Sequence, residues 1–223
     1  MRAKLLFPLL LCGLIACSHS DGARAREQLC NPLKARAPIV EDVHAQALQD
    51  AVLQGDLDTV RSLLDKGAHA DSLTRGYRSP LHAALAPTIA DPGENPLDVQ
   101  RSVAARLPSQ LALIELLLSR GADPGAVDIV GYTPLHFAVV GGYSDAQSTA
   151  LLAPLLRGAG DRDAKDVFGS TALMQAAALG KTQSVRALLQ AGADPRVTDC
   201  HGRTAAQIAR QRRHPDTARL LEK

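Results

Sequence analysis

The 223-residue chain is long enough for one sizeable domain, and its formal net charge of only +2 argues against a nucleic acid as its partner. Hydrophobic residues make up 46% of the sequence, but aromatic residues only 3%, and Trp is absent. A compact globular core usually contains larger anchors. A stack of small aliphatic hairpins does not need them, because each unit packs only against its neighbours. The composition therefore favours a repetitive architecture.

The segment 1–16 is expected to form an export signal. Arg2 and Lys4 precede an apolar run from Leu5 to Ile15, which is too short to span a bilayer. The residues Leu14-Ile15-Ala16-Cys17 resemble the lipobox of bacterial lipoproteins. This resemblance implies cleavage before Cys17, lipidation of its sulfur, and a periplasm-facing protein held in the cell envelope, with the outer membrane favoured. An ordinary secretory peptide with a chance cysteine is the alternative.

Residues 17–43 lack hydrophobic periodicity and are expected to be a lipid-anchored linker and lead-in. The chain then becomes repetitive. Gly131, Gly169 and Gly202 precede similar segments, and the first of the two intervals is slightly longer than the second, which indicates a short insertion. The second interval matches a period of about 33 residues, and such a period with two short helices is typical of a stacked helical repeat.

The same motif begins each of these segments. It reads Ser79-Pro80-Leu81-His82-Ala83-Ala84 and Thr133-Pro134-Leu135-His136-Phe137-Ala138, and weaker copies begin at Thr171 and Thr204. Over roughly residues 44–223 the chain therefore resembles the ankyrin family. The resemblance implies an all-α ankyrin-repeat solenoid of about five helix–turn–helix repeats with β-turn fingers. It also implies that His82 and His136 form hydrogen bonds within and between repeats.

The expected repeats cover residues 44–72, 73–125, 126–163, 164–196 and 197–223, and the second carries an insertion at 86–110. The prolines of this insertion predict a loop with a short helix over Leu97–Leu107, ahead of a separate helix from about Leu111 to Ser119. The insertion is either a partner contact or a tolerated surface loop. In the third repeat, Pro154 is expected to kink or restart the second helix.

Each repeat junction is expected to form a finger with an Asp-x-x-Gly tip, at residues 128–131, 166–169 and 199–202. Stacking would align these tips along one edge, where their apolar residues either bind a partner or pack on neighbouring fingers. The first alternative, together with the exposed face of the first helices, gives the expected partner-binding residues: Arg75, Tyr77, Ile129, Val130, Phe137, Val167, Phe168, Gln175, Leu179 and His201.

Few residues support any chemistry. No zinc-ligand spacing, P-loop or Gly-x-Ser-x-Gly motif is present, so no catalytic residue, metal or cofactor is expected. After processing, Cys30 and Cys200 are the thiols other than Cys17. An exported protein permits a disulfide between them, but only if the lead-in runs back along the stack. The arginines of the last repeat are expected to form a solvated cap, with an anionic lipid or acidic protein surface as the alternative.

Together these observations predict a non-catalytic, monomeric lipoprotein that captures or inhibits another protein in the bacterial envelope, with no small-molecule substrate. The resemblance to secreted bacterial ankyrin proteins implies two specific forms. One is an immunity protein against a toxin delivered into the periplasm, and the other is an accessory factor for a periplasmic catalase. An enzyme with a site in the 86–110 insertion, or a purely structural tether, are the remaining alternatives.

Overall fold

The computed structural model describes residues 44–73, 78–86, 96–158 and 160–222, and only the backbone of residues 96–104. Within these ranges the regular structure is helical. The helices are α2 (Ala45–Gln54), α3 (Leu57–Asp65), α4 (Pro80–Ala84), α5 (Pro96–Ser119), α6 (Pro134–Val140), α7 (Asp145–Leu156), α8 (Ala172–Ala178), α9 (Thr182–Gln190), α10 (Ala205–Gln211) and α11 (Pro215–Leu221).

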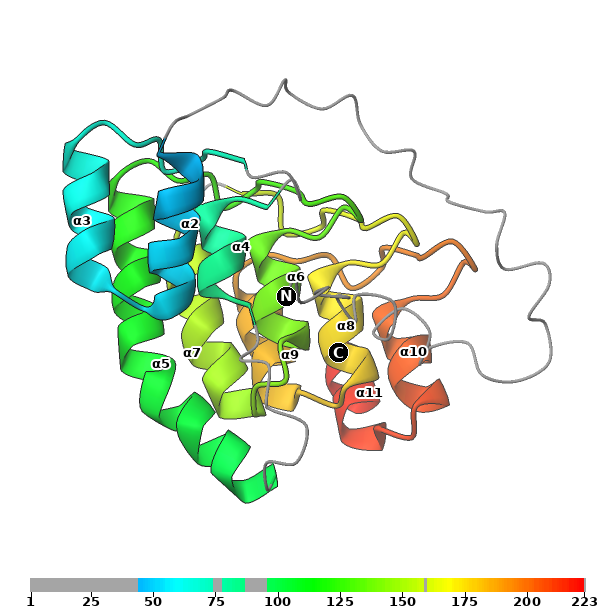
Figure 1. The fold of residues 1–223 in the computed structure, drawn as a ribbon. Helices are drawn as coiled ribbons and strands as arrows, with labels where there is room; N and C mark the ends of the chain where they lie inside the picture. The colour runs from blue at the N-terminus through cyan, green and yellow to red at the C-terminus, as the bar shows by residue number, and fades with distance from the viewer. Residues whose placement is uncertain (1–43, 74–77, 87–95, 159, 223) are drawn as a thin grey trace, which may run out of the picture.

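Consecutive helices pair as antiparallel hairpins, and the hairpins stack in chain order (Figure 1). One row contains α2, α4, α6, α8 and α10, and each of these helices contacts the next member of the row. We call this the inner row. The outer row contains α3, α5, α7, α9 and α11, linked in the same way. The expected all-α solenoid of helix–turn–helix repeats is confirmed.

Small side chains let the inner-row helices pack closely. Ala84, Ala138, Ala176 and Ala209 occupy equivalent positions in four helices, and all four are buried. Leucines such as Leu81, Leu135 and Leu173 fill the space between the two rows. This arrangement explains how a chain with so few aromatic residues buries a continuous core: each layer is completed by the next repeat rather than by a large anchor.

The motif residues begin the inner helices as expected. Thr133 and Thr171 are N-caps in extended conformation, and Pro134 occupies the first turn, where its missing N–H has no intrahelical partner. The Thr171 hydroxyl accepts a hydrogen bond from the Met174 N–H at 3.3 Å. The sequence therefore sets the starts of α6 and α8 locally.

The two motif histidines connect successive repeats. Nδ1 of His136 lies 2.9 Å from the Thr133 hydroxyl and accepts from the Thr133 N–H, while Nε2 lies 3.1 Å from the Ser170 carbonyl of the next repeat. His82 bridges Ser79 and Tyr132 in the same way. The expected hydrogen bonding of both histidines within and between repeats is confirmed.

A second polar link, at the opposite end of the helices, joins α7 to α9. The Asp145 carboxylate accepts from the Gln183 and Ser184 N–H groups, and therefore caps the first turn of α9 from the preceding repeat. Buried Lys181 donates to the Val139 carbonyl at 2.6 Å and to the Ser148 hydroxyl at 2.8 Å. Burial lowers the pKa of Lys181 to about 8. The sequence analysis did not identify this link.

Where the prolines predicted a new helix, the structure shows a continuous one. The predicted short helix over Leu97–Leu107 and the separate helix from about Leu111 are one continuous helix, α5, with Pro108 inside it. Its C-terminal half is held by buried Leu113, Ile114 and Leu117, and packing of this kind offsets the backbone hydrogen bond that a proline removes. Residues 87–95 of the expected insertion lie outside the described residues.

In the third repeat, Pro154 lies in the last turn of α7 and does not restart the helix. The insertion lengthens this helix instead: α7 has 12 residues, whereas α9 has 9. Among the helices of the described ranges, none combines the length and apolar character needed to cross a bilayer.

One turn between paired helices carries backbone strain. Gly55, Gly142 and Gly180 adopt positive φ angles of 76°, 78° and 66° after α2, α6 and α8, but Arg213 takes the equivalent place after α10 at φ 63°. We expect Arg213→Gly to raise the free energy of unfolding by about 0.5–1 kcal/mol, because glycine adopts this conformation without a Cβ clash.

Urea unfolding measures this difference. The matched control is Arg212→Gly, since Arg212 has an ordinary φ of −85°. It should leave stability unchanged or lower it. A rise of equal size in both variants would show that removal of positive charge, and not backbone strain, is responsible.

Candidate functional site

The three described fingers share one internal geometry. In the first, Oδ1 of Asp128 accepts from the Val130 and Tyr132 N–H groups at 2.9 Å each. Asp166 and Asp199 repeat this pattern in the next two fingers. The final glycine of each tip has a positive φ, 79° for Gly131, which an L side chain rarely adopts. The Asp-x-x-Gly sequence therefore determines the turn, and the two intervening residues are left to vary.

Backbone hydrogen bonds join the fingers into a row that extends from one end of the helices (Figure 1). The Val167 N–H donates to the Val130 carbonyl at 3.0 Å, and the Cys200 N–H donates to the Phe168 carbonyl at 3.2 Å. Lys165 adds a side-chain bond to the Thr198 carbonyl at 2.8 Å. The expected alignment of the tips along one edge is confirmed for these three fingers.

Several expected contact residues are accessible. Ile129 is 44% exposed, Phe168 is 46% exposed and Leu179, at the end of α8, is 50% exposed. His201 is also exposed, and Val130 and Gln175 are half-buried. These six residues of the three fingers and of α8 are called the finger surface below. Large exposed apolar side chains on adjacent tips are the feature expected of a protein-binding strip.

Two expected contact residues are buried and do not belong to this surface. Val167 is 6% exposed, because the backbone bond to Val130 draws its tip position against the neighbouring finger. Phe137 is also 6% exposed. Its ring packs edge-on against His82 and Tyr132, and the Arg78 guanidinium lies 5.2 Å from its centroid. Phe137 thus supports the finger base instead of contacting a partner. Arg75 and Tyr77 lie outside the described residues.

Of the cations around this surface, Arg203 belongs to the expected basic cap of the last repeat, whereas sequence reasoning missed Arg78 and Lys165. Arg78 covers Phe137, Lys165 lies at the second finger, and Arg203 pairs with Asp199 at 2.7 Å. The carboxylates of Asp128, Asp166 and Asp199 are buried inside the turns. Lys165 is exposed and Arg203 is half-buried, so both cations are more accessible to solvent than the three carboxylates. No periodic pattern in the sequence separates these two sets, because both belong to the same short loops.

The pKa values of the finger carboxylates Asp166 and Asp199 shift in opposite directions. Burial raises the pKa of Asp166 to about 6, although its Oδ1 accepts two backbone hydrogen bonds. Asp199 is also penalised by burial, but the hydrogen bond and charge of Arg203, with the backbone donors, outweigh this and lower its pKa. Ser170 replaces Arg203 in the second finger, so Asp166 lacks that compensating cation.

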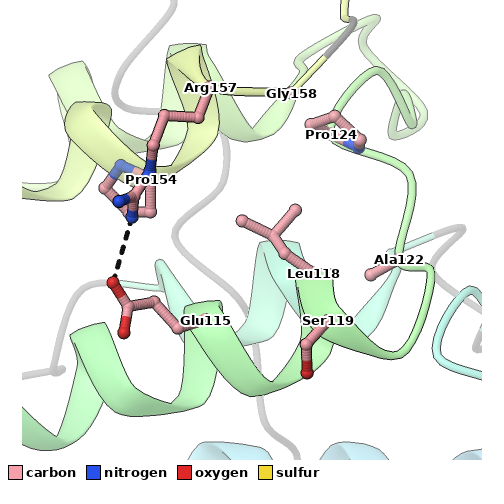
Figure 2. A pocket seen from close by; sticks show the side chains of 8 residues that line it. All are labelled: Glu115, Leu118, Ser119, Ala122, Pro124, Pro154, Arg157 and Gly158. Atoms are coloured by element: carbon pink, nitrogen blue, oxygen red, sulfur yellow. Dashed lines mark hydrogen bonds and ion pairs between the residues drawn. The ribbon is translucent and has the colours of Figure 1, made fainter.

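A hollow of about 530 Å³ lies between α5 and α7 in the outer row (Figure 2). Leu118, Pro124 and Pro154 line it, and the Arg157–Glu115 ion pair at 3.0 Å runs along one side. Both ionic side chains are mostly exposed, so the pair contributes little stability. In the described part of the chain, His, Cys, Asp and Glu do not gather in groups of three that could hold a metal. The residues that line the hollow therefore include no metal-binding group of this kind.

The comparisons with known proteins agree with this geometry. A family profile described as Ankyrin repeats (3 copies) matches residues 102–199 and 144–223. The chain is 33% identical over 200 residues to the B-cell lymphoma 3 protein homolog of Mus musculus, covering 80% of this chain but only 43% of that protein.

Shorter relatives are covered more completely. The Cyclin-dependent kinase 4 inhibitor B of Rattus norvegicus is 34% identical over 120 residues, which are 54% of this chain and 87% of that protein. Protein PhlB of Serratia liquefaciens is 33% identical over 144 residues, which are 64% of this chain and 60% of that protein.

The pKa shifts predict opposing effects of pH on stability. Burial lowers the pKa of His136 from 6.5 to about 4, so the unfolded chain binds the proton first and stability falls as pH drops from 6.5 to 4, by roughly 3 kcal/mol. Asp166 acts in the opposite direction. Its raised pKa makes the folded state the better proton acceptor between pH 3.8 and about 6, so its contribution to stability falls as pH rises.

Removing the opposing carboxylate should expose the histidine effect. We expect Asp166→Asn to show a steeper loss of stability than the wild type between pH 6 and pH 4, measured by urea unfolding. Asp199→Asn is the control: the pKa of Asp199 is lowered, so its carboxyl stays mostly ionised in both the folded and the unfolded chain over this range, and the slope should change little. Equal slopes in all three proteins would contradict the assignment of Asp166.

Proposed function

The chain belongs to the ankyrin-repeat family, a family of protein–protein interaction modules, and on that premise we propose that it captures and blocks a partner protein on its finger surface. The observation that carries this proposal is the exposure of Ile129 and Phe168 on fingers joined by backbone hydrogen bonds. Exposed apolar side chains on a rigid edge lose little conformational freedom when they are covered, which favours binding.

Blocking of the partner is supported by one relative. The rat protein of which this chain covers 87% is named an inhibitor of a cyclin-dependent kinase, and by analogy we propose inhibition as the outcome of capture by this chain. In this reading the present chain acts without catalysis: it needs affinity and shape, and no reacting group. The immunity and catalase-accessory forms of this function differ in the partner and not in the mechanism.

The cations around the finger surface favour a partner with an acidic rim. Lys165 lies at the second finger, and Arg203 lies at the third, where it pairs with the buried carboxylate of Asp199. Complementary charge at the rim of an interface increases the association rate and its dependence on salt more than it increases affinity. Apolar contact at Ile129 and Phe168 would supply the affinity.

We further propose that this surface acts in the bacterial cell envelope, from a lipid anchor on Cys17. The support is the sequence Leu14-Ile15-Ala16-Cys17 after a basic and apolar leader; these residues lie outside the described ranges. With residues 17–43 as a linker, the stack would face the periplasm and reach partners near the membrane surface.

Substitution of the finger tips tests the binding surface. We expect Ile129→Asp combined with Phe168→Ser to weaken capture of the partner from envelope extract by tenfold or more, because buried apolar anchors carry most of the binding energy. Thermal stability should not change, since both side chains are exposed. The control, Ala153→Asp, adds one charge at an exposed position of α7 in the outer row and should bind normally. A folded double variant with unchanged affinity would rule out the finger surface.

A separate experiment tests the anchor. When the full chain is expressed in a bacterium, it should partition into the detergent phase of a phase-separation extraction, and Cys17→Ala should remain uncleaved or become soluble. Cys30→Ser is the matched control and should keep the wild-type partition. Wild-type protein in the aqueous phase would contradict lipidation while leaving the binding proposal intact.

A further inference from the structure

Cys200 forms a disulfide bond in the structure, with a partner that lies outside the described residues. It is half-buried at the tip of the third finger, where its N–H donates to the Phe168 carbonyl of the second finger. We infer that its partner is Cys30, and that the Cys30–Cys200 disulfide ties the segment before the first repeat to the last finger of the stack.

The number of cysteines limits the alternatives. The chain has four, and the three other than Cys200 are Cys12, Cys17 and Cys30, all of which precede the first described helix. Whichever sulfur is used, the bond therefore joins the two ends of the stack. Cys12 lies in the apolar run of the expected export signal, and a lipidated Cys17 sulfur is already a thioether. The choice of Cys30 over these two rests on the proposed lipidation.

The distance along the stack is compatible with this bond. The first and last repeats are separated by four steps, each about 8–10 Å for packed helices, or roughly 40 Å in all. The chain from Cys30 to His44 comprises about 14 residues, and a chain of that length reaches at most about 50 Å when extended. The connection is therefore long enough to span the row, but it has little slack.

The bond would act where the stack is weakest. Among the described helices, each repeat packs mainly on its neighbours, so the first and last repeats each adjoin one other repeat rather than two. Cys30 and Cys200 enclose most of the sequence between them, and closing so long a loop removes a large amount of conformational entropy from the unfolded chain. The bond would also fix the third finger, which carries His201, beside Phe168 of the second finger. The rigidity of the finger surface would then depend on redox conditions.

Formation of the bond requires a disulfide oxidant. One thiolate attacks the disulfide of an oxidised dithiol carrier to form a mixed disulfide, and the second thiolate displaces the carrier. The two cysteines lose two protons and two electrons, and the carrier leaves as a dithiol. An oxidising compartment such as the bacterial periplasm maintains this exchange, whereas the cytosol keeps thiols reduced.

Peptide mapping of the unreduced protein tests the pairing. The full chain is expressed with export, purified without reductant, alkylated and digested. We expect one linked pair of peptides that contains Cys30 and Cys200, lighter than the two reduced peptides together by the mass of two hydrogen atoms, and lost in Cys30→Ser. Pairing of Cys200 with Cys12 or Cys17, or alkylation of Cys200 in the folded protein, would overturn the inference.

Thermal unfolding tests the consequence. Reductant should lower the unfolding midpoint of the wild type by roughly 10 °C, and Cys30→Ser and Cys200→Ser should unfold at that lower temperature with or without reductant. Cys12→Ser should behave like the wild type. A Cys30→Ser variant that still responds to reductant would contradict the pairing. Neither measurement requires the partner protein, so this inference can fail while the proposed binding function stands.

Discussion

The hydrogen bond from a motif histidine to the backbone of the next repeat is the interaction on which the arrangement depends. Nε2 of His82 reaches the Tyr132 carbonyl and Nε2 of His136 reaches the Ser170 carbonyl, and each carbonyl directly follows a finger. The histidine therefore fixes the finger of one repeat against the first helix of the repeat before it. Burial keeps the imidazole neutral, because it lowers the pKa of both rings. The core packing sets the helix spacing, but this bond sets where the binding edge lies.

Histidine holds the middle of the stack, and other residues replace it toward the ends. Gln49 occupies the motif position in the first repeat and Met174 occupies it in the fourth. Methionine cannot donate a hydrogen bond to a carbonyl, so no such bond forms from Met174 to the fifth repeat. Other polar contacts link the fourth and fifth repeats: the Lys165–Thr198 bond, the Thr182–Thr217 hydroxyl pair and the Cys200–Phe168 backbone bond. The Lys165–Thr198 bond is exposed, whereas the Thr182–Thr217 pair is part-buried, as are the histidine bonds to the next repeat. A covalent tie at Cys200 would add to these links at the C-terminal end of the stack.

The sequence predicted the features that are decided locally. The caps at Thr133 and Thr171 and the Asp-x-x-Gly turns follow from hydrogen bonds within a few residues, and the fold follows from their repetition. The sequence-based prediction was wrong where contacts with a neighbouring repeat determine burial or helix length. Val167 and Phe168 are adjacent apolar residues of one tip, yet one is buried by the preceding finger and the other is exposed. The prolines of the insertion predict two helices where α5 is one, because the sequence alone does not show that Leu113 and Leu117 hold the helix against the core.

This division between local and neighbour-dependent features explains why the exposed tips point to binding. The shape of a finger is determined by its aspartate, its glycine and its backbone links, none of which requires an apolar side chain at Ile129 or Phe168. Exposing such side chains to water carries a cost of about 25 cal/mol for each Å² left uncovered, which a polar residue at the same position would avoid. None of the described contacts shows that this exposure stabilises the fold. A partner that covers both side chains would recover that free energy, so the tips are better explained by recognition than by folding.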